Sequence, residues 1–215
     1  MPALKIDSSW KRTLLALAIG IMSLIIFSVF PTNNFLENLT KSLFFLLLIP
    51  FLFVKVVLGE TVSNFGMRFK LEKALLLELI IFVLASVSLM YLVINYTDFP
   101  KHYSLSPVIR NSFPMFVFYE LCLVNLLLLF QEYFFKGFLL SIFREKFSYF
   151  SIAIQAIIYL IPLFIVSSSI WNTIPMIIIS ILGGILAYRS RTFFYSYLGS
   201  LLFLIILDAY LIYLS

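Results

Sequence analysis

The residues that could do chemistry in this chain are ionisable side chains set within long apolar runs. They are Lys55, Glu78, Glu120, Glu132, Lys136 and Asp208. If the runs cross a membrane, each of these groups is costly to bury and is therefore a functional candidate. Lys55 and Glu78 lie near the ends of their runs, where a long side chain can reach the polar interface. Asp208 lies about two turns from the C-terminus, where it could face the same kind of interface.

One apolar run carries a polar seam. Asn125, Glu132 and Lys136 are spaced by seven and four residues, so on a helix they share one face. Glu132 precedes Lys136 by four residues, which is the favourable order for a helical ion pair. Glu120 and Gln131 are eleven residues apart and are expected to line a neighbouring stripe. The seam predicts either an ion pair that stabilises bundle packing or the lining of a catalytic or transport cavity.

Known intramembrane hydrolytic sites need residues that the apolar runs do not supply. The chain has one His, His102, and one Cys, Cys122. One His cannot provide the H-E-x-x-H motif of a zinc protease, and His102 falls in a polar loop, away from any Ser in a span. Asp208 is the only Asp within a run, so the sequence contains no aspartyl dyad. The sequence therefore predicts no metal site and no cofactor, and it does not assemble a hydrolytic site.

The elements that must position these residues are membrane-spanning helices. Of the 215 residues, 63% are hydrophobic and 12% are charged, with a mean hydropathy of +1.10. A soluble domain has about 45–50% apolar and about 25% charged residues. The composition excludes a water-soluble globular protein and leaves no room for a soluble catalytic or nucleic-acid-binding domain. We predict an all-α, polytopic helical bundle in contact with membrane lipids.

Seven apolar runs are long enough to be spans. They are 13–30, 42–59, 74–95, 113–143, 148–166, 173–188 and 193–214. The first is predicted to be an uncleaved span, because it is too long for a typical signal peptide and no cleavage site follows. The fourth would be a helix of roughly 46 Å, so it must tilt or protrude from the bilayer.

The basic residues are unevenly divided between the two sides of this arrangement. With the N-terminus inside, the inner loops hold ten of the 15 Lys and Arg residues, and the outer loops hold Lys41, Lys101 and Arg110. This is the positive-inside asymmetry of membrane proteins, and splitting run 113–143 in two would weaken it. It predicts an integral membrane protein with a cytoplasmic N-terminus, and we expect the membrane to be a bacterial plasma membrane. The net charge of +5 is thus explained without a nucleic-acid partner.

The segment QEYFFKG at 131–137 resembles the first motif of the CPBP family, also called the Abi family. Its members are CAAX proteases and bacteriocin-processing enzymes, which are glutamate-dependent intramembrane proteases, and their pattern there is E-E-x-x-x-R followed by Gly. The segment FGMR at 65–68 is similar to a short family segment that precedes a span. The segments GGILAY at 183–188 and TFFYS at 192–196 resemble the helix pair of the third motif.

The resemblance covers roughly residues 60–215. We therefore expect 60–215 to form a CPBP-like membrane core and 1–59 to form an N-terminal hairpin of two spans. By the resemblance, the water-activating Glu of the family falls on Gln131, the second Glu is kept as Glu132, and the Arg falls on Lys136. A Gln cannot act as a general base, and Lys lacks the bidentate fork of Arg.

The remaining family positions are also substituted. The His of the second motif should fall within 154–163, where the chain has no His. The His of the third motif falls on Ser200, and the Asn four residues later falls on Leu204. The resemblance thus implies a member without the catalytic set, a pseudoprotease.

Three functions remain open. The first is an inactive CPBP-like protein that binds another integral membrane protein or a membrane-embedded peptide, as a regulatory subunit or in bacteriocin immunity. Gly183 and Ala187, four residues apart, would allow close helix approach to such a partner or within the bundle. The second is an active CAAX-type glutamic endopeptidase that uses Glu132 or Glu120. The third is a small proton- or cation-coupled transporter subunit that uses Glu120, Glu132 and Asp208.

Overall fold

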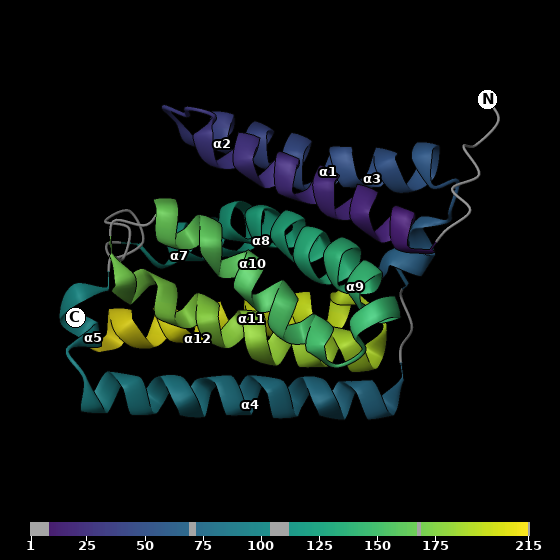
Figure 1. Ribbon diagram of the computed structural model, residues 1–215. Helices are drawn as coiled ribbons and strands as arrows, with labels where there is room; N and C mark the ends of the chain where they lie inside the picture. Colours follow the sequence, from purple (N-terminus) through teal and green to yellow (C-terminus); the bar gives the residue numbers. More distant parts are fainter. Residues whose placement is uncertain (1–8, 69–71, 104–111, 167–168, 215) are drawn as a thin grey trace.

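The structure, a computed structural model, describes residues 9–68, 72–103, 112–166 and 169–214. Over these residues every regular element is a helix (Figure 1). Helices are expected for apolar runs of this length, because a backbone in lipid must satisfy its hydrogen bonds within the segment. Six of the helices are long and apolar enough to cross a membrane. The length and composition of these helices confirm the prediction of an all-helical polytopic membrane protein.

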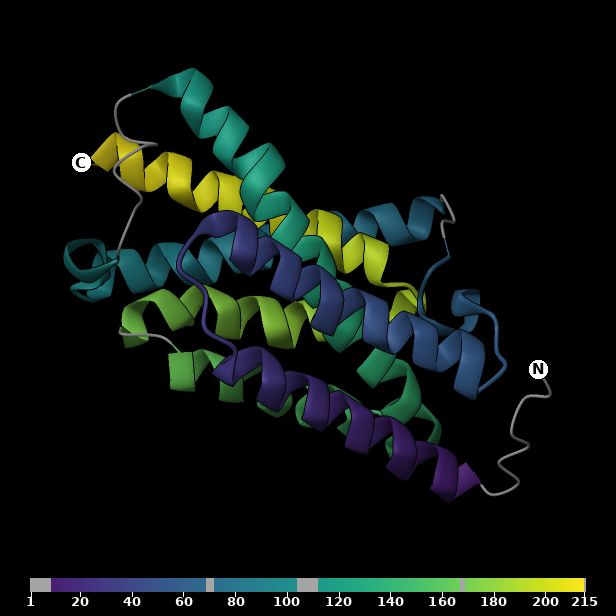
Figure 2. The ribbon, with the colours of Figure 1, turned by 90° about the horizontal axis from the view of Figure 1, so that it is seen from above.

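The N-terminal region forms a helical hairpin. The first helix, α1, covers Ser9–Val29. The side chain of Asn34 caps the returning helix by accepting a hydrogen bond from the Glu37 backbone N–H at 2.9 Å. The returning helix is made of α2 (Phe35–Ser42), the π-helical turn η1 (Leu43–Leu48), α3 (Ile49–Leu52) and the π-helical turn η2 (Phe53–Val57), and a short 3₁₀ helix, η3 (Val62–Phe65), follows. Figure 2 shows α1 and the returning helix running side by side, and α1 packs on η1 and α3.

A single long helix crosses the middle of the molecule. It runs continuously over Phe113–Phe147 and is about 52 Å long. Its parts are α7 (Phe113–Phe118), the π-helical turn η4 (Tyr119–Val124), α8 (Asn125–Glu132), the π-helical turn η5 (Tyr133–Leu139) and α9 (Leu140–Phe147). The prediction of one undivided helix here is confirmed, and its C-terminal end lies four residues beyond the expected one.

The remaining elements precede and follow this long helix. Before it come α4 (Lys73–Tyr96) and the short α5 (Phe99–His102). After it come α10 (Phe150–Val166), α11 (Ile170–Ser190) and α12 (Phe193–Leu214). With 17 residues, α10 is about 26 Å long and falls short of a hydrocarbon core of about 30 Å. Six helices, rather than the predicted seven, therefore have the length of a full span.

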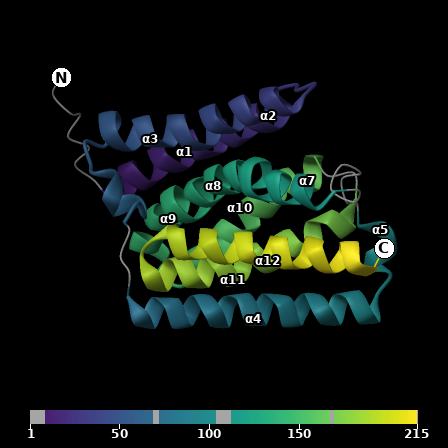
Figure 3. The same ribbon diagram turned by 180° about the vertical axis from the view of Figure 1, so that it is seen from behind.

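The helices stack in four layers (Figures 1 and 3). The N-terminal hairpin forms one outer layer and α4 forms the opposite one. The long helix and α10 lie beneath the hairpin, and α11 and α12 lie between them and α4. Helices α1, α4, α10 and α12 begin at the same end of the bundle, and the C-terminus lies at the other end. This arrangement places the polar residues of the long helix against α11 and α12.

Candidate functional site

A buried ion pair lies on the long helix where α8 meets η5. Glu132 and Lys136 are 1% and 2% exposed, and their Oε1 and Nζ atoms are 2.5 Å apart. Lys136 Nζ also donates to the Ile179 backbone carbonyl of α11 at 3.0 Å and to Ser196 Oγ of α12 at 2.9 Å. An ammonium group has three N–H donors, so all of them are used.

The carboxylate of Glu132 is bonded equally well. Its Oε2 accepts a hydrogen bond from Ser196 Oγ at 2.8 Å, and its Oε1 accepts one from Ser200 Oγ at 3.0 Å. Ser196 and Ser200 are four residues apart on one face of α12 and are both fully buried. We call Glu132, Lys136, Ser196 and Ser200 the inner cluster. Because its charges cancel and its donors are used internally, it is a closed network.

Gly183 of α11 makes room for this network. A Cβ atom added at Gly183 would collide with Lys136 Nζ and lie 2.6 Å from Ser196 Oγ. The sequence indicated that Gly183 and Ala187 permit close helix approach. In the structure Ala187 is 3% exposed, and the space at Gly183 is filled by the ammonium group rather than by another backbone.

The segment 65–68 is held against the long helix beside the inner cluster. Gly66 has a positive φ of 80°, and a Cβ there would lie 3.1 Å from Gly137 Cα. Thr192 Oγ1, at the start of α12, is within hydrogen-bonding distance of two carbonyl oxygens, those of Gly66 (2.9 Å) and Arg68 (2.7 Å). Three segments that are far apart in sequence therefore meet here: 65–68, the turn around Gly137, and the start of α12.

Gln131 points away from the inner cluster. Its Oε1 lies 3.5 Å from the hydroxyl of Tyr159 on α10. Both residues line a small cavity of about 30 Å³ that also involves Leu24, Leu46 and Pro162. The neighbouring residues Gln131 and Glu132 therefore face different surroundings, since Gln131 lies beside Tyr159 and Glu132 is bonded by Ser200.

Glu120 and Gln131, which their spacing predicted to line one stripe, have different partners in the structure. Glu120 faces Asp208 of α12, on the same side as Asn125, whose side chain accepts a hydrogen bond from Tyr197. The reason is the π-helical turn η4, in which the Asn125 N–H bonds the Glu120 carbonyl five residues earlier. The extra residue in this turn rotates Glu120 into line with Asn125.

The two carboxyl groups form a second buried site, which we call the outer cluster: Tyr103, Glu120 and Asp208. Glu120 is 1% exposed and Asp208 is 8% exposed, so Asp208 does not face the outer interface as the sequence allowed. Tyr103, which follows α5, donates from its hydroxyl to Asp208 Oδ1 at 3.1 Å. Burial, and then the charge of Asp208, raise the pKa of the Tyr103 hydroxyl, which keeps it a donor. Among the described residues no donor reaches either carboxyl oxygen of Glu120.

The other ionisable candidates take ordinary positions. Lys55 is exposed, with its ammonium 5.9 Å from the centre of the Phe51 ring. Glu78 forms an ion pair with Arg189 at 2.9 Å. His102 stacks on Trp171 at a ring separation of 5.2 Å.

Sequence reasoning missed several partners in these sites. Ser196, the Ile179 carbonyl and Tyr197 bond the seam, and Tyr103 bonds Asp208. The one available signal was the pair of serines four residues apart in an otherwise apolar span, since such hydroxyls often bond across membrane helices.

Comparisons of the chain with protein families, curated proteins and solved structures found no match.

Proposed function

We propose that this protein is a catalytically inactive, CPBP-like membrane protein that binds another integral membrane protein or a membrane-embedded peptide. The observation that carries the proposal is the closure of the inner cluster. The Glu132 carboxylate is neutralised by Lys136 and bonded by two serines, so both of its oxygens already have donors. The neighbouring Gln131 is an amide that cannot take up a proton, whereas general-base catalysis requires a group that can accept one.

The meeting of the segments that resemble the family supports the scaffold part of the proposal. Segment 65–68 packs on Gly137, which directly follows Lys136 in the first motif. Ser200, at the position of the third-motif His, donates to Glu132 at 3.0 Å. A His at 200 would thus lie beside the second glutamate position of the motif, whereas the Ser present here supplies a hydrogen bond that holds Glu132 in place.

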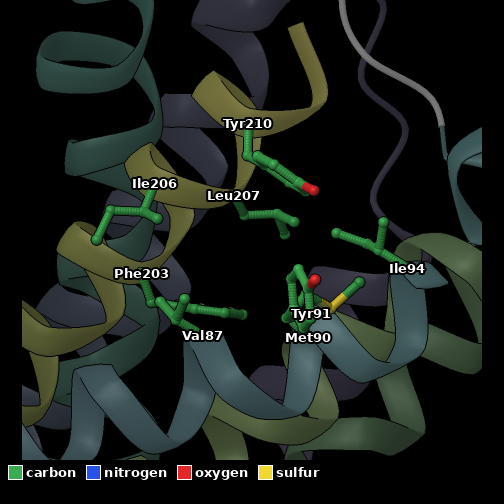
Figure 4. A pocket seen from close by; sticks show the side chains of 8 residues that line it. All are labelled: Val87, Met90, Tyr91, Ile94, Phe203, Ile206, Leu207 and Tyr210. Atoms are coloured by element: carbon green, nitrogen blue, oxygen red, sulfur yellow. The ribbon is translucent and has the colours of Figure 1, made fainter. Parts of the chain in front are cut away.

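An apolar groove between α4 and α12 is the proposed contact surface (Figure 4). It has a volume of about 210 Å³ and is lined by Val87, Met90, Tyr91, Ile94, Phe203, Ile206, Leu207 and Tyr210. Membrane helices associate mainly through close packing, because lipid tails are as apolar as their side chains. A groove of this kind gives a membrane-embedded segment more packed contact than a smooth helix face does.

The proposal includes α10 as a seventh crossing. It runs antiparallel to α11, beside which it packs, and a short span is accommodated by local thinning of the bilayer. Seven crossings agree with termini at opposite ends of the bundle. With this topology the positive-inside asymmetry supports a cytoplasmic N-terminus, and the proposed membrane is the plasma membrane of a bacterium.

The binding part is tested by affinity purification of the full chain in mild detergent. We expect a co-purifying membrane protein or peptide at a stoichiometric level. Ile206→Trp fills the groove and should abolish co-purification of this partner. Leu84→Trp, at an exposed position of α4 outside the groove, should leave co-purification unchanged. Isolation of the wild-type protein alone, or equal retention of the partner by Ile206→Trp, would contradict the proposal.

The inactive state is tested by incubating the reconstituted protein with prenylated and leader-type peptides. We expect no cleavage above that of empty vesicles. Cleavage by the wild-type protein that disappears in Glu132→Gln or Glu120→Gln would establish the active endopeptidase instead.

A further inference from the structure

A polar cleft opens at the end of the bundle where α1 begins and α9 ends. It has a volume of about 250 Å³ and brings together four arginines and two glutamates: Arg12, Arg68, Arg144, Arg191, Glu60 and Glu145. These residues come from α1, the segments on either side of η3, α9 and the C-terminal end of α11. Residues from five separate parts of the chain therefore converge on one cavity.

The glutamates do not balance the arginines. Arg12 forms ion pairs with both glutamates, with Glu60 at 2.5 Å and with Glu145 at 3.6 Å. Among the described residues, no carboxylate lies within ion-pair distance of Arg68, Arg144 or Arg191. The cleft thus has a formal charge of +2. Arg68 donates one hydrogen bond to Asn64 Oδ1, at 3.0 Å, so the guanidinium groups of Arg144 and Arg191 and the remaining N–H groups of Arg68 are left for an anion.

Helix electrostatics alone do not explain this arrangement. Arg144 lies in the last turn of α9 and Arg191 caps α11, positions where a cation is favourable against the helix dipole. Arg189 satisfies the same preference at the end of α11, but it points out of the cleft and pairs with Glu78. The dipole places cations at these helix ends, whereas the convergence on one cavity needs another reason.

We propose that this cleft binds a phosphate group, and that its source is the headgroup of an anionic phospholipid. The planar guanidinium fork matches phosphate oxygens in a bidentate manner. The cleft lies at the end of membrane-spanning helices, where lipid headgroups lie, and basic pockets between such helices are known lipid sites. It is separate from the α4–α12 groove, so its occupancy does not depend on the proposed partner.

The experiment uses the full-length protein in mixed detergent micelles with phosphatidylglycerol or phosphatidylcholine, and native mass spectrometry counts the bound lipid. We expect phosphatidylglycerol to be retained over phosphatidylcholine. Arg144→Gln/Arg191→Gln should weaken its binding by about fivefold for each arginine removed. Arg68→Gln/Arg144→Gln provides a second variant if the first does not fold, and Arg189→Gln, at the same end of α11, is the control that keeps wild-type binding.

Inorganic phosphate distinguishes the two sources of the group. Retention of phosphatidylglycerol against millimolar phosphate identifies the lipid, whereas displacement by phosphate identifies the free anion as the ligand of the same site. Equal retention of the two lipids by the wild-type protein, or wild-type retention of phosphatidylglycerol by a folded double variant, would overturn the site.

Discussion

The inner and outer clusters bury carboxyl groups between the same two helices but treat them differently. In the inner cluster Glu132 has a cation and two hydroxyl donors within 3.0 Å. In the outer cluster Glu120 faces Asp208, and Tyr103 supplies a hydroxyl to Asp208. Two ionised carboxylates in contact and shielded from water repel each other, and the outer cluster contains no cation to offset this repulsion. The two sites therefore differ in the partner of the buried carboxyl group, which is a cation in the inner cluster and a second acid in the outer cluster.

The largest loss of stability is expected when the cation of the inner cluster is removed. Lys136→Met leaves Glu132 buried without its counter-charge, and we expect a loss of about 3–5 kcal/mol in the free energy of unfolding. Unfolding in mild detergent, followed by circular dichroism, measures it. Lys55→Met, at an exposed lysine, is the control and should change stability little. A loss below about 1 kcal/mol for Lys136→Met would mean that the pair contributes little to the fold.

A smaller loss of stability is expected when the space around the Lys136 ammonium group is reduced. Gly→Ala within a helix normally favours the helix by up to about 1 kcal/mol. At Gly183 the added Cβ would displace a Lys136 Nζ held by three hydrogen bonds, so Gly183→Ala should cost about 1–3 kcal/mol instead. Thermal unfolding in detergent shows whether Gly183→Ala raises or lowers the stability. In the Lys136→Met background the cost should fall, and an unchanged cost there would assign the effect to Ser196 or to the backbone.

Removing a carboxylate should destabilise the protein much less in the outer cluster than in the inner cluster. Glu120→Gln removes no hydrogen bond from a described donor and relieves the contact between two acids, so stability should stay within about 1 kcal/mol of wild type. Glu132→Gln leaves Lys136 without its counter-charge and should cost several times more. Parallel unfolding curves compare the two variants. Equal losses would show that Glu120 has a partner equivalent to Lys136.

Much of the fold followed from the sequence, because apolar length and helical spacing are local properties. The long helix was predicted as one element, and the i, i+4 spacing of Glu132 and Lys136 predicted that they share a helix face. The direction of Glu120 was not predictable, because a π-helical turn shifts the register of every residue before it. The role of Gly183 depends on contact between α11 and a residue 47 positions earlier. The length of α10 is set by its ends, which are the least certain feature of any sequence-based prediction.

The central claim is that Glu132 and Lys136 act as one structural unit. A double-mutant cycle with Glu132→Gln, Lys136→Met and the double variant measures it most directly, using the free energy of unfolding in detergent. We predict that the double variant is more stable than Lys136→Met alone and that the coupling energy is about 2 kcal/mol or more. Losses that add to within about 0.5 kcal/mol would contradict the claim.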